Sequence, residues 1–290
     1  MRPYFIVCLC VAVLAGCATK PDQREFALQG QVLSVADDRQ QATINHEAIT
    51  GFMGAMTMPY KVHDPKQLEG ITPGDLINAR LVVETNDAYL TNVKKVGQAP
   101  LAKPPADVPA PPAASGFELL KPGDAVPETT FVDQSGRRRA FKAFKGAPVL
   151  LTFIYTKCPM PTFCPLMDQH FATIQKKLKD DPALRRRVHL VSLSFDPIND
   201  TPAVLKAHAT KLGADPNTWT FLTGDRDEID KFEMRFGVAV ARATADQRDI
   251  THNLRTALID ADGKLVKIYI GNEWTPDQAL ADLVPVVRAG

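Results

Sequence analysis

The sequence lacks an excess of charge of either sign, a dense set of cysteines and a long hydrophobic run. Lys and Arg total 34 and Asp and Glu total 33 among 290 residues, so the net charge is +1. This balance provides no basic surface for nucleic acid and no polybasic attraction to anionic lipid. Five cysteines are too few for a scaffold held together by disulfides. The 45% hydrophobic content is that of a globular protein, which excludes a disordered chain.

The N-terminus has the pattern of an export signal. Arg2 precedes an apolar run over residues 6–14, which is too short to span a bilayer. The next residues, Leu-Ala-Gly-Cys at 14–17, resemble a bacterial lipoprotein box; an ordinary secretory signal is the alternative. The resemblance implies that residues 1–16 are removed, that Cys17 is acylated, and that the protein is anchored by lipid in the periplasm. Because Ala rather than Asp follows the cysteine, the outer membrane is slightly favoured over the inner one.

A stretch rich in Pro and Ala divides the remaining chain into two modules. Residues 99–116 hold six Pro and six Ala, a composition that cannot build a core and favours an extended polyproline II linker. In the module over residues 24–98, short strands separated by turn residues predict a small all-β barrel of the OB-like type. In residues 117–290, strands alternate with helices and a hairpin lies near the end. This order predicts an α/β fold of thioredoxin type.

Methionines gather in the first module. Met53, Met56 and Met58 fall within six residues, and His46 precedes Met56 by ten. In a strand, Met56 and Met58 would point to the same face. Thioethers and imidazole are soft or borderline ligands that suit copper(I). The alternative is a hydrophobic core, because Met also fills gaps in cores well, and the spacing alone leaves both open.

Residues 27–96 resemble the periplasmic copper-binding domain CusF, a five-stranded barrel that binds one copper(I). The resemblance rests on Met56-Thr57-Met58 and on the upstream His46, and it implies that this histidine and the two methionines are ligands. In CusF a Trp ring stacks on the ion. Here Met53 stands at that place, three residues before Met56, where it would supply a third thioether.

Two cysteines lie in a proline-rich loop of the second module. A predicted strand leads into Thr-Lys-Cys-Pro-Met-Pro-Thr-Phe-Cys-Pro at 156–165. The pattern predicts Cys164 at a helix N-cap, where the positive end of the helix lowers the pKa of a thiol. Lys157 adds positive charge beside Cys158. Such thiols can cycle between dithiol and disulfide or bind a soft metal; a purely structural disulfide is the remaining alternative.

The second module resembles the SCO/SenC family of thioredoxin-like copper chaperones over nearly all of residues 117–288. The matching residues are Phe153-Ile154-Tyr155-Thr156, Cys158-Pro159, Cys164-Pro165, Ser194-Phe195-Asp196-Pro197, Asp200-Thr201-Pro202 and His252 before Leu258-Ile259-Asp260. The resemblance implies that Cys158, Cys164 and His252 bind copper, which is delivered to the dinuclear copper centre of cytochrome oxidase. The family has three residues between its cysteines, whereas this chain has five. The longer loop would loosen the metal site, or favour thiol–disulfide chemistry or another acceptor.

Three functions follow from these patterns. The first is a membrane-anchored copper carrier, whose barrel captures copper(I) and whose partner is the copper-centre subunit of cytochrome oxidase or another periplasmic copper or thiol acceptor. The second is a thiol–disulfide oxidoreductase, and the third a copper-resistance buffer. Two independent sets of soft ligands in one chain favour the first. Asp196 and Asp200 are expected to cap the turn into the following helix.

Overall fold

The computed structural model describes residues 23–101, 118–181, 184, 187–242 and 250–289. Cys17 and most of the predicted linker at 99–116 lie outside the described residues. Within the described residues, no helix is both long enough and apolar enough to cross a membrane.

The N-terminal strands form a closed barrel in the order β1-β2-β3-β5-β4. The strands are β1 (Arg24–Val35), β2 (Gln41–His46), β3 (Met56–Val62), β4 (Asp75–Val83) and β5 (Ala88–Gln98), with a short 3₁₀ turn, η1 (Pro65–Leu68), between β3 and β4. Gly30 of β1 lies opposite His46 of β2. A Cβ atom on Gly30 would lie 2.6 Å from the Asn45 carbonyl oxygen and 2.8 Å from the His46 Cα, so this close crossing requires glycine.

The C-terminal part is built on a seven-stranded sheet in the order β14-β13-β8-β9-β10-β6-β7. Its strands are β6 (Thr130–Asp133), β7 (Arg138–Ala140), β8 (Val149–Ile154), β9 (His189–Ser194), β10 (Trp219–Thr223), β13 (Arg255–Ile259) and β14 (Leu265–Ile270). The central strands β8, β9 and β10 pair in parallel, and each strand outside them pairs antiparallel with its neighbours. The other elements are η3 (Phe141–Phe144), α1 (Cys164–Asp180), α2 (Pro202–Lys211), α3 (Arg226–Met234), α4 (Pro276–Ala289) and the hairpin of β11 (Val240–Arg242) and β12 (Ile250–His252).

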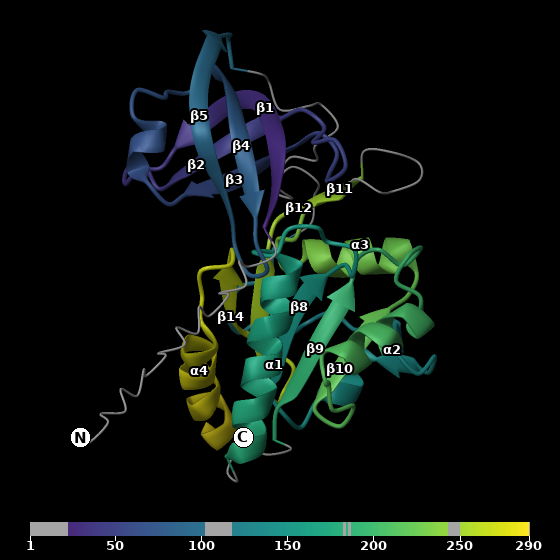
Figure 1. The fold of residues 1–290 in the computed structure, drawn as a ribbon. Coiled ribbons are helices and arrows are strands. Elements are labelled where there is room, and N and C mark those ends of the chain that lie inside the picture. The colour runs from purple at the N-terminus through teal and green to yellow at the C-terminus, as the bar shows by residue number, and fades with distance from the viewer. Residues whose placement is uncertain (1–22, 102–117, 182–183, 185–186, 243–249, 290) are drawn as a thin grey trace, which may run out of the picture.

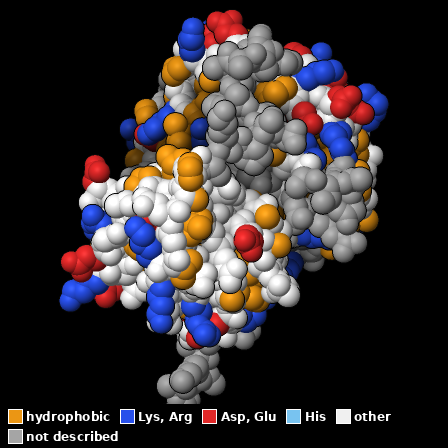
Figure 2. All heavy atoms as spheres, turned by 90° about the horizontal axis from the view of Figure 1, so that it is seen from above, with side chains coloured by type: hydrophobic (Ala, Val, Ile, Leu, Met, Phe, Trp, Pro, Cys, Tyr) orange, Lys and Arg blue, Asp and Glu red, His pale blue; other side chains and the backbone are white. Residues whose placement is uncertain are grey.

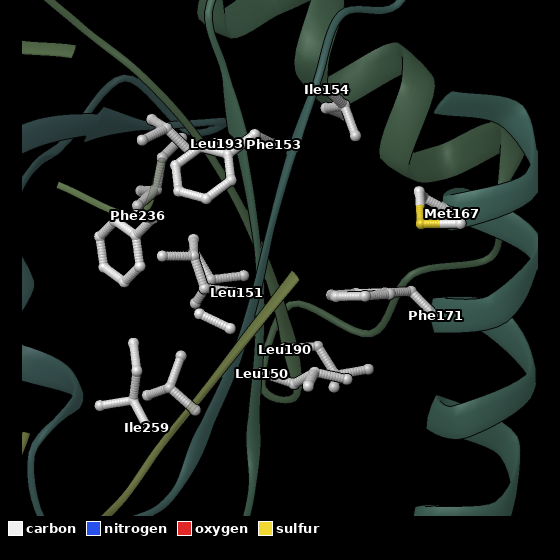
Figure 3. Packing of buried hydrophobic residues seen from close by; sticks show 14 of the residues in the cluster. Leu150, Leu151, Phe153, Ile154, Met167, Phe171, Leu190, Leu193, Phe236 and Ile259 are labelled. Carbon is white, nitrogen blue, oxygen red and sulfur yellow. The ribbon is translucent and has the colours of Figure 1, made fainter. Parts of the chain in front are cut away.

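Strand β8 is buried along its whole length because both faces of the sheet are covered. Figure 3 shows Met167 and Phe171 of α1 approaching the sheet from one side, whereas Phe153 and Phe236 lie on the other. The ring centroids of Phe153 and Phe236 are 5.5 Å apart. This packing holds the end of β8, and with it the loop that carries the cysteines, against the N-terminal end of α1.

The barrel lies over the carboxyl ends of β8 and β9, where α1 also begins (Figure 1). Polar contacts join the two parts: Gln169 Nε2 donates to Asn86 Oδ1 at 3.0 Å, and Lys61 Nζ lies 3.9 Å from Glu273 Oε1. Viewed from the barrel end, positive and negative side chains are interspersed (Figure 2), as the near-zero net charge suggests.

The predicted fold class is confirmed: a five-stranded all-β barrel precedes a mixed α/β unit. Strand β10 and the β11–β12 hairpin are not predicted by the sequence pattern. In β10 the apolar residues are interrupted by Thr220 and Thr223, which are nevertheless buried. The neighbouring strands bury these threonines, which the local sequence does not reveal. Because the segment has neither an alternating pattern nor a continuous apolar run, it is not recognisable as a strand.

Candidate metal centres

Three potential ligands converge where the barrel meets the sheet. Cys158 lies in the loop after β8, Cys164 is the first residue of α1, and His252 ends β12. One ligand atom from each lies within 4.8 Å of the other two, and Cys164 Sγ is 3.7 Å from His252 Nε2. The residues predicted from the sequence for this site are therefore brought together, although they come from three separate elements.

The imidazole of His252 is oriented by its surroundings. Its Nδ1 lies 3.1 Å from the Asn253 carbonyl oxygen. When Nδ1–H donates to this carbonyl, the lone pair of Nε2 faces Cys164. The rings of Phe195 and Tyr155 pack beside the imidazole, with centroids 4.6 Å and 5.7 Å away. The orientation suits a metal ligand that must be neutral when it binds.

The two thiols are not equivalent. Both cysteines are free, with Cys158 partly buried and Cys164 fully buried. A hydrogen bond from the Cys164 thiol lowers the pKa of Cys158 well below its ordinary value, an effect that outweighs burial and is reinforced by His252. Burial raises the pKa of Cys164, which also has the Cys158 thiolate beside it. The pKa values of the two thiols are thus shifted in opposite directions, that of Cys158 downward and that of Cys164 upward.

The expectation that Cys164 has a lowered pKa is wrong. The N-cap of α1 is Phe163, so Cys164 is the first helical residue and Pro165 the second. The Cys164 side chain is only 1% exposed. Loss of solvation of the charged thiolate outweighs the favourable helix end, so burial determines the direction of the shift.

The buried carboxyl group of Asp200 holds the start of the cysteine loop, a role that the sequence pattern does not predict. Asp200 accepts hydrogen bonds from the Thr156 N–H at 3.0 Å, from Thr156 Oγ1 at 2.5 Å and from Ser194 Oγ at 2.5 Å. The expected cap is wrong for Asp200, because Thr201 caps α2. Asp196 caps the turn before α2 as expected, since its Oδ1 accepts from the Asn199 N–H at 3.4 Å and its carboxylate also accepts from the Asn199 side chain. Thr156 follows β8 and Ser194 ends the adjacent parallel strand β9, so polar residues at two neighbouring strand ends were the signal that could have revealed the Asp200 contact.

In the barrel, His46 and Met56 are direct cross-strand partners between β2 and β3. His46 is 1% exposed, and its Nδ1 lies 2.7 Å from the Glu47 carbonyl oxygen. Its Nε2 is buried and has no hydrogen-bond partner among the residues that the structure describes. Burial also lowers the pKa of His46. A neutral imidazole with a buried, unpaired nitrogen is the form that binds a soft metal.

The other methionines lie around this pair. Met58 is two residues beyond Met56 on β3 and is buried, so it contributes to the barrel core as well as to a possible ligand set. Tyr60 Oη donates to Met53 Sδ at 3.9 Å, and the Tyr60 ring contacts that of His46 with centroids 5.6 Å apart. Tyr60 thus links Met53 to His46.

Comparisons with known proteins match both parts of the chain. Residues 120–288 match the family model SCO1/SenC, and residues 25–95 match the model for the copper binding periplasmic protein CusF. A SCO1 protein homolog of Bacillus subtilis is 35% identical over 156 residues, covering 53% of this chain and 78% of the relative.

Two solved structures share the fold of the C-terminal part. A SCO1/SenC family lipoprotein from Bacillus anthracis has a TM-score of 0.51 and 30% identity, covering 58% of this chain and 98% of its own. BsSco, described as a member of the Sco family of cytochrome c oxidase assembly proteins with a disulfide switch, has a TM-score of 0.50 and 31% identity, covering 60% and 100%. These comparisons confirm both predicted resemblances and support copper as the metal.

Proposed function

The chain belongs to the SCO1/SenC family, and on that premise we propose that it is a lipid-anchored periplasmic copper carrier. In this proposal the barrel captures copper(I), and the thioredoxin-like part delivers it for assembly of a copper centre. Copper is the cargo. The acceptor is the copper-centre subunit of a cytochrome oxidase or another periplasmic copper or thiol acceptor.

The observation that carries the proposal is the convergence of Cys158, Cys164 and His252 within 4.8 Å. Two sulfurs and an imidazole nitrogen form a soft donor set, which suits copper. Both thiols would bind as thiolates and lose their protons when the metal binds.

The barrel supplies donors of a different kind. Thioethers of Met53, Met56 and Met58, with the buried Nε2 of His46, are neutral and soft, so they would hold copper(I) and discriminate against hard cations. Protons compete with copper for thiolate sulfurs, but they do not compete for the thioether sulfurs of the methionines. The barrel is therefore suited to first capture.

Anchoring and location rest on the N-terminal motif and on the relatives. The Leu-Ala-Gly-Cys motif ending at Cys17 supports acylation, with the outer membrane slightly favoured. The Bacillus anthracis relative is described as a lipoprotein, and the CusF model as a periplasmic protein. BsSco is described within a family of oxidase assembly proteins, which supports delivery to an oxidase.

Copper stoichiometry of the reduced full-length protein tests the proposal. We expect one copper(I) at each site, with the barrel ion lost in Met56→Leu/Met58→Leu and the other lost in Cys158→Ser/Cys164→Ser. Leu preserves the volume of Met but removes the sulfur. Met234→Leu in α3 is the matched control and should bind as the parent does. Unchanged copper content in Met56→Leu/Met58→Leu would show that these methionines serve only as core.

The inequivalent thiols also favour a second candidate, a thiol–disulfide oxidoreductase. The low pKa of Cys158 provides an attacking thiolate, and Cys164 stands beside it as the resolving thiol. His252→Ala separates the two functions, because the imidazole takes no part in the sulfur–sulfur bond. A carrier would bind copper more weakly in this variant while keeping its dithiol redox reaction. Unchanged copper binding, together with loss of disulfide reduction in Cys158→Ser, would identify a reductase whose copper belongs to the barrel alone.

A further inference from the structure

The two candidate metal centres open onto one cavity. A cavity of about 410 Å³ lies between the barrel and the sheet unit. Its walls include Met58 of β3 from the barrel, His252 of β12 from the other part, and Phe163 of the cysteine loop. A ligand from each predicted site therefore borders the same space.

The five-residue loop between the cysteines reaches into the barrel. Met160 is 3% exposed and belongs to the same hydrophobic cluster as Met58, against which Met53 and Met56 also pack. Cys158 packs against this cluster and against the core of the sheet unit. The loop thus buries the side chain of Met160 in the hydrophobic cluster that contains Met58, with Cys158 two residues before it.

The backbone of the loop keeps these two sulfur-bearing residues together. The Met160 carbonyl oxygen accepts a hydrogen bond from the Phe163 N–H at 3.1 Å, and the Cys158 Sγ lies 3.9 Å from the same oxygen. On the far side of the loop, Asn272 Nδ2 donates to the Thr162 carbonyl oxygen at 2.7 Å. Met160 is consequently part of a folded turn at the interface.

We propose that copper(I) passes within one molecule from the barrel to the dithiol, with the Met160 thioether as the intermediate ligand. This inference rests on the proposed function and adds to it a route, a direction and a residue. The loop between the cysteines is, in this view, the physical connection between the two sites.

The transfer is a ligand exchange without oxidation or reduction. Copper keeps its single positive charge while its bonds to the barrel thioethers and the His46 imidazole break and a bond to the Met160 sulfur forms. That bond then breaks as bonds to the sulfurs of Cys158 and Cys164 and to the imidazole of His252 form. The protons of the two thiols leave to solvent. Thiolates carry negative charge and thioethers do not, so copper(I) is held more strongly by the dithiol. This difference sets the direction from barrel to dithiol.

A methionine that only fills space would behave in the same way as leucine. Met160→Leu therefore isolates the sulfur from the packing. The matched control is again Met234→Leu, which makes the same change in α3, a helix that supplies none of the candidate ligands.

The experiment follows the filling of the dithiol in reduced full-length protein. Copper(I) is supplied as its complex with bathocuproine disulfonate, a bulky chelator, and protection of the cysteines from alkylation is timed. We expect Met160→Leu to fill about tenfold more slowly, with unchanged final copper content, which corresponds to about 1.4 kcal/mol on the barrier. Met234→Leu should fill at the parental rate. Met56→Leu/Met58→Leu should also slow filling. Adding Met160→Leu to this double variant should not lower the filling rate further, because the changes interrupt one route.

Two results would overturn the proposed transfer through Met160. One is filling of Met160→Leu at the parental rate, and the other is a slowing by Met160→Leu that adds fully to the slowing by Met56→Leu/Met58→Leu. Failure of the proposed function has a separate signature, since the parent protein would then lack copper at one of its sites at equilibrium. Final copper content and filling rate are read from the same samples, so the two failures are distinguished.

Discussion

At the scale of single residues, Asp200 shows how a buried carboxyl group can support the loop that carries a candidate metal ligand. Its carboxylate receives hydrogen bonds from Thr156, just before the cysteine loop, and from Ser194 at the end of β9. Hydrogen bonds to a charged acceptor are among the stronger ones in proteins. Asp200 thereby ties two neighbouring strand ends together beneath Cys158.

Asp200→Ala should leave the Thr156 N–H and two hydroxyl groups buried without their acceptor. We expect the free energy of unfolding to fall by about 3 kcal/mol, measured by urea denaturation. Copper binding by the Cys158 site should weaken as the loop loses its support. Asp262→Ala, at an exposed turn between β13 and β14, is the control and should change stability little. Equal stability of the two variants would show that the Asp200 contacts are not structural.

At the scale of elements, the β6–β7 hairpin is closed by one carboxylate. Asp133 accepts from the Ser135 N–H at 2.9 Å, from Ser135 Oγ at 2.5 Å and from the Arg137 N–H at 3.0 Å, and Arg139 donates to it at 3.1 Å. Gly136 takes φ = 81° in the turn, which favours glycine. Burial alone would raise the pKa of Asp133, but these hydrogen bonds outweigh it and lower the pKa to about 2.

Asp133 should make stability depend on acid pH. Because its pKa is lower in the folded than in the unfolded state, its contribution is complete above the ordinary value of 3.8 and is lost as the pH falls toward about 2. Urea unfolding measured at successive pH values below about 5 should show this loss. Asp133→Asn should be less stable at neutral pH and should lack this part of the acid dependence. An identical acid dependence in the variant and the parent would contradict the assignment.

At the scale of the whole molecule, the barrel and the sheet unit share an interface that also contains the cysteine loop. Met160 and Met58 belong to one hydrophobic cluster, while Cys158 and Phe163 contact both cores. The arrangement places the barrel over the carboxyl ends of the parallel strands (Figure 1), where loops carry functional groups in open α/β sheets. Capture and delivery would then take place across one face.

Anchoring is also a property of the whole molecule. Cys17→Ser should remove the acylation site, so the protein should appear in the soluble fraction or remain unprocessed, as measured by membrane fractionation and mass spectrometry. Stable anchoring requires more than one acyl chain, which a lipoprotein cysteine supplies. Cys10→Ser, within the predicted signal, should leave anchoring unchanged. Normal processing and membrane retention of Cys17→Ser would exclude the lipoprotein assignment.

The sequence by itself determined the fold class, because strand and helix patterns are local properties of the chain. The resemblance of its short motifs to the SCO/SenC family named Cys158, Cys164 and His252. Only the tertiary structure decided in which direction the pKa of each thiol is shifted. The helix end near Cys164 is visible in the sequence, but its burial depends on packing from distant elements, and burial determines its pKa. The place of Met160 in the barrel cluster was likewise decided only by tertiary structure, since its contacts join segments far apart in the chain.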